Sequence, residues 1–135
     1  MRIVLDTNVV VSGLLNPYGP PGRIVDLLLA EQLRPLFDDR MISEYREVLA
    51  RPKFGFRAAD VRDFLAHVEA VGEPVIPVPL SITLPDPDDL PFLEVAAAGL
   101  ARALVTGNVQ HFAPTRGAHE VTVVSPGQFL KRIRP

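Results

Sequence analysis

Acidic and amide side chains stand beside several apolar segments, where they could bind a metal ion together. They are Asp6 after the apolar run 3–5, Asp86, Asp88 and Asp89 before residues 92–102, and Thr106, Gly107 and Asn108 after residues 103–105. Open α/β sheets bind ligands beyond the carboxyl ends of their strands, so these groups can converge on one edge. Glu44, near the start of an expected helix, can reach the same edge.

The residue types in these groups indicate which metal and which reaction to expect. The chain contains no cysteine, so a metal ion would be held by Asp, Glu, Asn, His or backbone oxygen. Clustered carboxylate oxygens favour Mg²⁺ or Mn²⁺ over zinc. Such clusters commonly serve phosphoryl chemistry, because the metal activates water and offsets the charge that develops on the phosphate. The pattern therefore predicts a centre that acts on phosphate esters.

Each of these residues also has a structural explanation when it is taken singly. Asp6 and Asp89 stand where they could cap the helices that follow them. Aspartates in a proline-rich loop commonly form turns, and so does an asparagine after a glycine, such as Asn108. A first-turn position suits Glu44 through the helix dipole alone. Only the joint placement of these residues favours a functional role.

The three histidines show no spacing that predicts a zinc site. His67 falls in an amphipathic segment, His119 in an expected loop, and His111 near the expected edge of the sheet. We interpret all three as structural or surface residues.

Apolar periodicity and turn residues predict strands that alternate with helices. We expect strands at residues 2–5, 33–37, 75–79, 103–106 and 121–124, and helices at residues 9–15, 24–32, 43–51, 58–71, 92–102 and 126–133. Ser43 is the expected N-cap of the third helix, and residues 16–22 are an expected turn. This alternation predicts an α/β fold with a mainly parallel central sheet.

Length and composition limit the class of protein. A chain of 135 residues suits one domain, residues 1–135, and a net charge of −2 argues against a protein that coats nucleic acid by charge alone. No apolar stretch could span a bilayer and no secretory pattern precedes Asp6, so we expect a cytoplasmic protein without membrane contact. Two basic groups could be local binding surfaces or solvated helix faces: Arg40, Arg46, Arg51, Lys53, Arg57 and Arg62, and Lys131, Arg132 and Arg134.

Four sequence motifs in a fixed order resemble a known family. They are Ile3 to Val9, Ser43 to Leu49 with Arg51 to Phe54, Asp86 to Asp89 before Phe92 to Ala96, and Leu104 to Asn108. Together they resemble the PIN-domain family, in particular the small single-domain VapC-like toxins of toxin–antitoxin systems. The resemblance covers nearly the whole chain. It implies a three-layer α/β/α fold and a metal-dependent ribonuclease.

The resemblance also implies which residues form the catalytic centre. Asp6 matches the first acidic ligand, Glu44 the second with Glu47 as a fallback, and Asp89 the third with Asp88 close behind. The fourth position is often an aspartate in the family and is Asn108 here, so a second bound metal is less expected. We expect one Mg²⁺ or Mn²⁺ ion at Asp6 and Asp89, with Glu44 bound directly or through water. Supporting hydrogen bonds would come from Thr7, Asn8, Ser12 and Thr106.

The same resemblance implies a small antitoxin as partner and allows a homodimer. It also implies hydrolysis of an RNA phosphodiester, with the basic residues between Arg40 and Arg62 holding substrate phosphates. A second interpretation is a PIN-like domain that no longer cleaves and instead binds RNA or protein, which the neutral Asn108 supports. A third is a phosphatase with Asp6 as nucleophile, although Asn8 replaces the second aspartate that such enzymes need. A dinucleotide-binding role is weaker still, because no Gly-x-Gly-x-x-Gly follows a strand.

Overall fold

The fold is an α/β structure built on a parallel sheet. The computed structural model describes residues 1–115 and 120–134. In these residues the sheet has five strands in the order β3-β2-β1-β4-β5, and every neighbouring pair is parallel. The strands are β1 (Arg2–Leu5), β2 (Arg34–Phe37), β3 (Glu73–Pro74), β4 (Ala103–Val105) and β5 (Val123–Val124). The expected parallel sheet is therefore confirmed.

The helices alternate with the strands along the chain. The α-helices are α1 (Thr7–Leu15), α2 (Pro20–Leu29), α3 (Asp39–Leu49), α4 (Ala58–Val71), α5 (Leu90–Ala98) and α6 (Pro126–Ile133). Short 3₁₀ helices lie between some of them: η1 (Pro52–Phe54), η2 (Pro87–Asp89) and η3 (Val109–Thr115). His119 lies outside the described residues, so its expected loop position stays a prediction.

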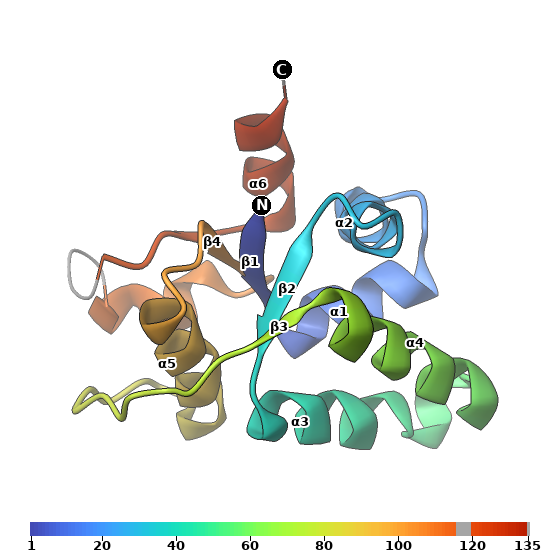
Figure 1. Ribbon diagram of the computed structural model, residues 1–135, viewed down its shortest axis with the longest axis horizontal. Helices are drawn as coiled ribbons and strands as arrows, with labels where there is room; N and C mark the ends of the chain where they lie inside the picture. The colour runs from blue at the N-terminus through green and yellow to red at the C-terminus, as the bar shows by residue number, and fades with distance from the viewer. Residues whose placement is uncertain (116–119, 135) are drawn as a thin grey trace.

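The helices cover both faces of the sheet and give three layers. Helix α5 packs against β1, β2 and β4 on one face, whereas α1, α2 and α4 lie on the other (Figure 1). Right-handed crossovers produce this division, because the chain runs from β1 outward to β3 and then returns to β4 on the opposite side of β1. The central strand β1 is covered on both sides, and its residues Ile3, Val4 and Leu5 are at most 1% exposed.

The carboxyl ends of the strands point toward α3, at the foot of Figure 1, and α6 lies at the opposite end beside the start of β1. Polar residues follow the strands at the carboxyl edge: Asp6 after β1, Asp38 after β2 and Thr106 after β4. The sheet therefore presents these side chains together at one edge.

The start of α3 differs from the sequence prediction. Ser43 was the expected N-cap, but the helix begins at Asp39, and Asp38 Oδ1 accepts a hydrogen bond of 3.0 Å from the Met41 N–H. Met41 and Ile42 are buried, so the apolar face of the helix extends a full turn ahead of Ser43. A cap that directly follows a strand is hard to recognise in sequence, because Asp38 and Asp39 also read as the end of a strand.

Other boundaries also shift. Helix α2 starts at Pro20 inside the expected turn, because proline is well suited to the first turn of a helix. Helix α5 ends at Ala98 rather than near residue 102, where Leu100 takes a positive φ of 52°. Strand β3 is Glu73–Pro74, ahead of the predicted strand 75–79. The prolines at 77 and 79 lack the N–H that a longer ladder would need.

The helices α1 and α2 approach each other closely. A Cβ placed on Gly13 would lie 2.6 Å from Val25 Cγ2 and 2.7 Å from the Pro21 carbonyl oxygen. Only glycine fits there, and this contact fixes α1 at the sheet edge that carries Asp6. No helix among the described residues has the length and apolar character needed to cross a membrane.

Candidate active site

An acidic cleft of about 340 Å³ lies at the carboxyl edge of the sheet. It is lined by residues from β1 and α1, from α3, from the loop before α5 and from the turn after β4: Asp6, Thr7, Asn8, Val11, Ser12, Glu44, Val48, Phe54, Asp86, Asp88, Asp89, Asn108 and His111. The structure therefore brings the sequence-predicted residues into one cleft, apart from Thr106, which is buried behind Asp6.

Asp6 lies at the base of this cleft and is held by two hydrogen bonds. Its Oδ1 accepts from the Thr7 backbone N–H at 2.8 Å, and its Oδ2 accepts from the Thr106 hydroxyl at 2.8 Å. The Asp6 backbone N–H donates to the Val105 carbonyl at 2.9 Å, which extends the pairing of β1 with β4. Asp6 is thus both the N-cap of α1 and a cleft residue, so the two explanations of this residue are compatible.

Glu44 reaches the cleft from α3, and its carboxylate accepts a hydrogen bond from the Thr7 hydroxyl. Glu47, the fallback ligand, lies one turn further along α3, where its exposed carboxylate pairs with Arg51 at 3.2 Å. The geometry of α3 therefore separates the two glutamates: Glu44 lines the cleft and Glu47 does not.

The proline-rich loop contributes its three aspartates to the opposite wall. Asp86 Oδ1 accepts from the Asp88 N–H at 2.9 Å and so forms the turn that starts η2. Asp89, expected as a possible cap of α5, makes no capping hydrogen bond with its side chain. Its side chain is only 14% exposed and lies in the cleft, with an Oδ2 3.7 Å from His111 Nδ1.

The turn after β4 is connected to Asp6 through a chain of hydrogen bonds. The Asn108 N–H donates to the Thr106 Oγ1 at 3.0 Å, and that hydroxyl donates in turn to Asp6. The Gly107 N–H donates to Asn8 Oδ1 at 3.0 Å. Asn8 therefore closes the cleft floor between α1 and the turn, in a supporting position.

Burial, and to a lesser extent the charges of neighbouring carboxylates, raise the pKa of the cleft acids. Burial raises the pKa of Asp6, and the hydrogen bonds from Thr106 and Thr7 oppose the rise. Burial likewise raises the pKa of Glu44, with a further contribution from the negative charge of Asp6. For Asp89, burial and then the charges of Asp6 and Asp86 raise the pKa to about 6. Groups of like charge forced together in a cleft are typical of a functional site.

Two features of the cleft were not assigned a role from sequence. His111, expected at the surface, is 41% exposed and also lines the cleft, where its charge lowers the pKa of Asp89. Val11, Val48 and Phe54 form an apolar part of the wall. Phe54 follows a proline that ends α3, and sequence spacing alone gave no sign that the chain turns back toward the carboxylates there.

A divalent cation suits the donor set of this cleft. Five carboxylates provide hard oxygen ligands, and a cation among them would offset both the repulsion between their charges and the cost of burying them. Within residues 1–115 and 120–134, no three acidic or histidine side chains already surround one point closely enough to hold a metal ion. Glu44 and Asp6 instead accept hydrogen bonds from the threonines beside them.

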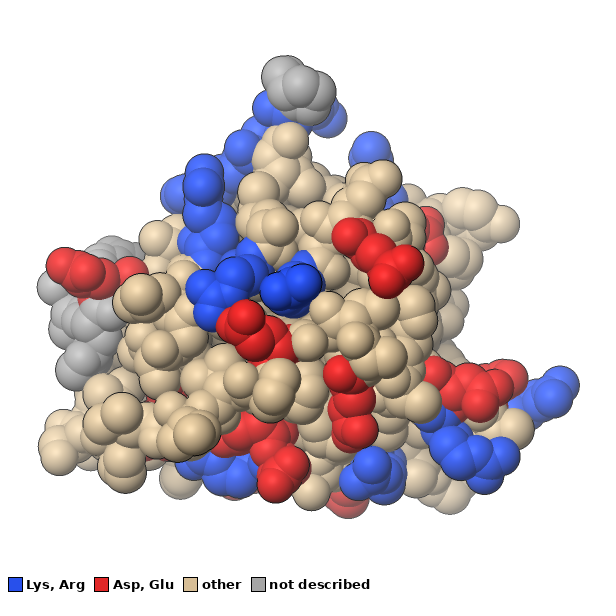
Figure 2. Space-filling model, in the orientation of Figure 1, with Lys and Arg blue, Asp and Glu red and all other residues tan. Residues whose placement is uncertain are grey.

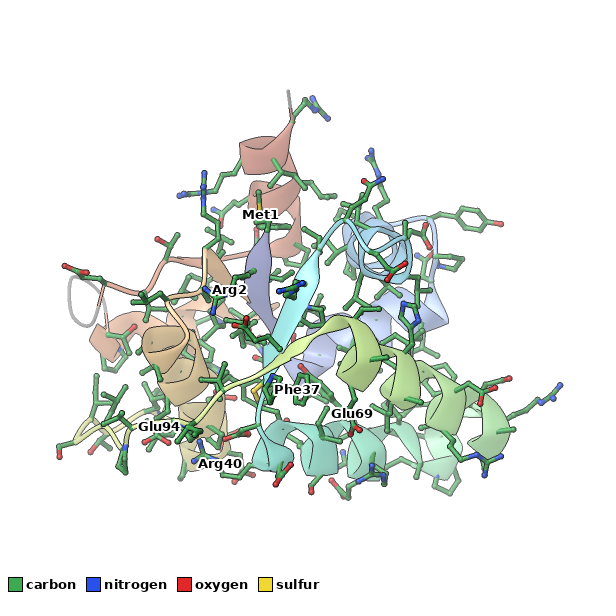
Figure 3. The ribbon with its side chains drawn as sticks, viewed as in Figure 1. Met1, Arg2, Phe37, Arg40, Glu69 and Glu94 are labelled. Atoms are coloured by element: carbon green, nitrogen blue, oxygen red, sulfur yellow. The ribbon has the colours of Figure 1, made fainter. Side chains whose placement is uncertain are left out.

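The basic stretch from Arg40 to Arg62 is largely engaged in other contacts. Arg40 links α3 to α5 through Asp38 and Glu94, with its Nη1 2.8 Å from the Glu94 carboxylate (Figure 3). Arg51, after the end of α3, pairs with Glu47 of α3, and Arg57, just before α4, pairs with Asp60 of α4. Arg46 and Arg62 border a separate hollow of about 450 Å³ between α3 and α4, which is mostly apolar.

Comparison with known proteins assigns the family. The sequence profile of the PIN domain matches residues 2–110, which include every residue of the acidic cleft except His111. The chain is also similar to an uncharacterized protein of Methanocaldococcus jannaschii, with 48% identity over 33 residues, a segment that covers 24% of this chain and 21% of that protein. PIN domains are in general nucleases that use divalent metal ions. With most of its length matched, the chain belongs to the PIN-domain family.

Proposed function

We propose that this protein is an endoribonuclease that requires Mg²⁺ or Mn²⁺ and hydrolyses phosphodiester bonds of single-stranded RNA. The observation that carries the proposal is the convergence of Asp6, Glu44 and Asp89 on one cleft, each with a raised pKa. A structural role would leave this group of buried and partly buried acids uncompensated, whereas metal binding would give their charges a partner.

In this proposal Asp6 and Asp89 hold the metal ion, with Glu44 opposite and Asp88 at the rim. When bound, the ion supplies a water of lowered pKa and offsets the charge that develops on the phosphate. The hydrogen bonds from Thr106 and Thr7 fix both oxygens of Asp6 before substrate arrives. Their role is to orient a ligand carboxylate, as the outer groups of metal sites do.

Neutral and apolar residues of the cleft would contact the RNA. Asn8, Ser12 and Asn108 offer uncharged donors to phosphate oxygens, so they add no repulsion. Phe54 lines the cleft, with the Phe56 ring centroid 6.0 Å and Lys53 Nζ 5.1 Å from its own ring centroid, and an unpaired base would stack there by displacing the Lys53 side chain. A surface for base stacking favours single-stranded RNA over a duplex, because paired bases are not free to stack on a side chain.

The two glutamates of α3 provide a matched test of the proposal. With Mn²⁺, we expect Glu44→Gln and Asp6→Asn to lower cleavage of a labelled single-stranded RNA by about 100-fold or more. The exposed Glu47→Gln should cleave at the wild-type rate, and chelation should stop every variant. Cleavage that survives both chelation and the Asp6→Asn substitution would refute the metal–carboxylate mechanism.

The proposal extends to a biological role as the toxin of a toxin–antitoxin system, which is supported by the resemblance of the motifs to small PIN-domain toxins. A small antitoxin would then bind the toxin and block the acidic cleft. The protein would act in the cytoplasm. It would form a homodimer if apolar helix faces of two copies pack against each other. Coexpression of an antitoxin from a neighbouring reading frame should restore growth that the wild-type protein inhibits, and Asp6→Asn should not inhibit growth.

Asn108 favours a second candidate function, a PIN domain that binds RNA or protein without cleaving it. Asn108 lines the cleft where relatives often have an acid, so the site has one negative charge fewer. RNA binding without cleavage under any divalent cation would support this second function. We expect Asn108→Asp to increase the rate with Mn²⁺ if the site is catalytic.

A further inference from the structure

We propose that four arginines at the amino edge of the sheet form a binding site for the sugar–phosphate backbone of RNA, outside the acidic cleft. These residues, Arg34, Arg2, Arg102 and Arg132, are called the arginine row. The inference rests on RNA as the proposed substrate. It places a positively charged surface for phosphate at the amino edge of the sheet, because the described residues that line the acidic cleft at the carboxyl edge include no Lys or Arg.

Backbone contacts place the four arginines side by side. Arg2 and Arg34 are register partners on the adjacent parallel strands β1 and β2. The Arg102 N–H donates to the Arg2 carbonyl at 2.8 Å, at the start of β4. Arg102 and Arg132 then line one hollow of about 160 Å³, together with Ala103, Phe129 and Ile133. Since neighbouring strands lie about 4.8 Å apart, the row crosses three strands and reaches α6.

The positive charge of the row is only partly neutralised. The Glu73 carboxylate accepts hydrogen bonds from the Arg2 guanidinium, including one of 3.0 Å from Arg2 Nε to Glu73 Oε2. Its other oxygen, Oε1, lies 3.8 Å from Arg34 Nη1. Among residues 1–115 and 120–134, no ion pair involves Arg102 or Arg132, and no acid lines the hollow that they share. Figure 2 shows a band of basic side chains from α6 down to the sheet, with one acidic patch below it.

Structural roles account for only part of this arrangement. Ion pairing with Glu73 explains Arg2, and the helix dipole favours Lys131 and Arg132 in the last turn of α6. Neither explains Arg102, which is exposed and lines the hollow beside another guanidinium. Like charges on neighbouring elements repel, so an anion bound between them would stabilise the row.

Without a bound cation, the cleft attracts a phosphate backbone less than the arginine row does. Five carboxylates line the cleft and repel a phosphate backbone, and Arg40, Arg51 and Arg57 are already paired with acids. A guanidinium binds a phosphate through two parallel hydrogen bonds, so a row of them suits a chain of phosphates. Figure 3 shows Arg2 of this row far from Arg40 and Glu94, which lie near the carboxyl edge.

The two sites are separated by the length of the strands. A strand of four residues spans about 13 Å, so one RNA molecule must run along the side of the sheet to occupy both sites. A short oligonucleotide can occupy the cleft or the row but not both. Affinity should therefore rise with RNA length in the wild type.

The test measures binding of a labelled oligouridylate by fluorescence anisotropy, with chelator present, over a series of salt concentrations. The variant Arg102→Gln/Arg132→Gln removes two charges of the row. The matched control, Arg57→Gln/Arg62→Gln, also removes two charges, at Arg57 just before α4 and at Arg62 within α4. Each phosphate contact to a single strand contributes about 0.7 to the slope of log K against log salt. We expect the row variant to lower the slope by about 1.4 and to weaken binding at least several-fold.

A charge-conserving variant guards against a change in folding. Arg102→Lys/Arg132→Lys should keep most of the salt slope, and circular dichroism should match for all variants. The proposal is overturned if the wild type binds no oligouridylate, or if the row variant binds it with the wild-type slope. It is also overturned if the row variant changes only the oligomeric state, which would identify the row as a protein interface. The binding test does not depend on cleavage. A wild type that binds oligouridylate through the arginine row but fails the cleavage assay would refute the proposed ribonuclease and leave the arginine row supported.

Discussion

At the scale of single residues, Asp89 shows how the cleft balances charge against burial. Its carboxylate accepts no hydrogen bond among the described residues, and its only charged partner is His111 at 3.7 Å. Burial and the neighbouring acids therefore raise its pKa to about 6. The ionised form of this side chain therefore costs free energy in the folded protein, and a bound cation would offset that cost.

This cost predicts how stability depends on pH. The folded-state pKa of about 6 lies above the unfolded value of 3.8, so the contribution of Asp89 is fully present below pH 3.8 and is lost as the pH rises through 6. In chelator at about pH 8, Asp89→Asn should be more stable than the wild type by about 1 kcal/mol, a figure reduced for solvent screening. The difference should shrink toward pH 4. Urea denaturation at several pH values measures it, and parallel curves for the two proteins would contradict it.

The sequence predicted the members of the cleft better than their connections. Asp6, Glu44 and Asp89 could be proposed from their places after strands and before helices. The Thr7 hydroxyl bond to Glu44 could not, because it joins residues 37 positions apart and depends on how α1 and α3 cross. The sequence predicts a structural or surface role for His111 and not its place in the cleft, because a lone histidine in a short 3₁₀ segment has no periodic pattern that fixes its direction.

At the scale of elements, α3 depends on Asp38. This residue caps the helix through the Met41 N–H and also pairs with Arg40 at 2.7 Å. It therefore fixes where α3 begins, and with it the turn of the helix on which Glu44 faces the cleft.

The two possible caps of α3 give a direct comparison. Asp38→Ala should lower the free energy of unfolding by about 1–2 kcal/mol, because the capping hydrogen bond and the ion pair are both lost. Ser43→Ala should change it by less than about 0.5 kcal/mol, because Ser43 is an exposed residue inside the helix. Urea denaturation of both variants measures the difference. A larger loss for Ser43→Ala would mean that the helix starts where the sequence first suggested.

The contact between α1 and α2 predicts a second difference between elements. A methyl group on Gly13 would overlap the Pro21 carbonyl at 2.7 Å, so Gly13→Ala should destabilise the protein by about 1–3 kcal/mol. Gly127 in α6 has no neighbouring atom within 4 Å of a built Cβ, and Gly127→Ala should be neutral or slightly stabilising. Thermal denaturation checks both, and equal melting temperatures for the two variants would contradict the close packing.

At the scale of the whole molecule, the parallel sheet was predictable from the sequence, but the length of each element was not. The strand β1 is recognisable because Ile3 to Leu5 form an unbroken apolar run, as expected for a strand covered on both faces. Strand β3 was misplaced because its residues Glu73 and Pro74 have no strand character. They pair with Leu36 and Phe37 only because α4 returns the chain to that edge.

Metal binding in the cleft should raise the free energy of unfolding of the whole protein. A ligand that binds only the folded protein stabilises it by about 2.7 kcal/mol at 100 times its Kd. We therefore expect Mn²⁺ at about pH 8 to raise the wild-type melting temperature by several degrees. Asp6→Asn should respond little, and Glu47→Gln should respond as the wild type does. Equal responses of all three proteins would place the metal elsewhere.

The hydrogen bond from Thr106 to Asp6 spans 100 positions of the sequence. During synthesis, Asp6 and Glu44 leave the ribosome long before Asp89 and Thr106 do. A nascent chain therefore carries the first acids without the residues that orient and complete them. The cleft is assembled only when β4 inserts beside β1, so the acids cannot act together until that strand has been made.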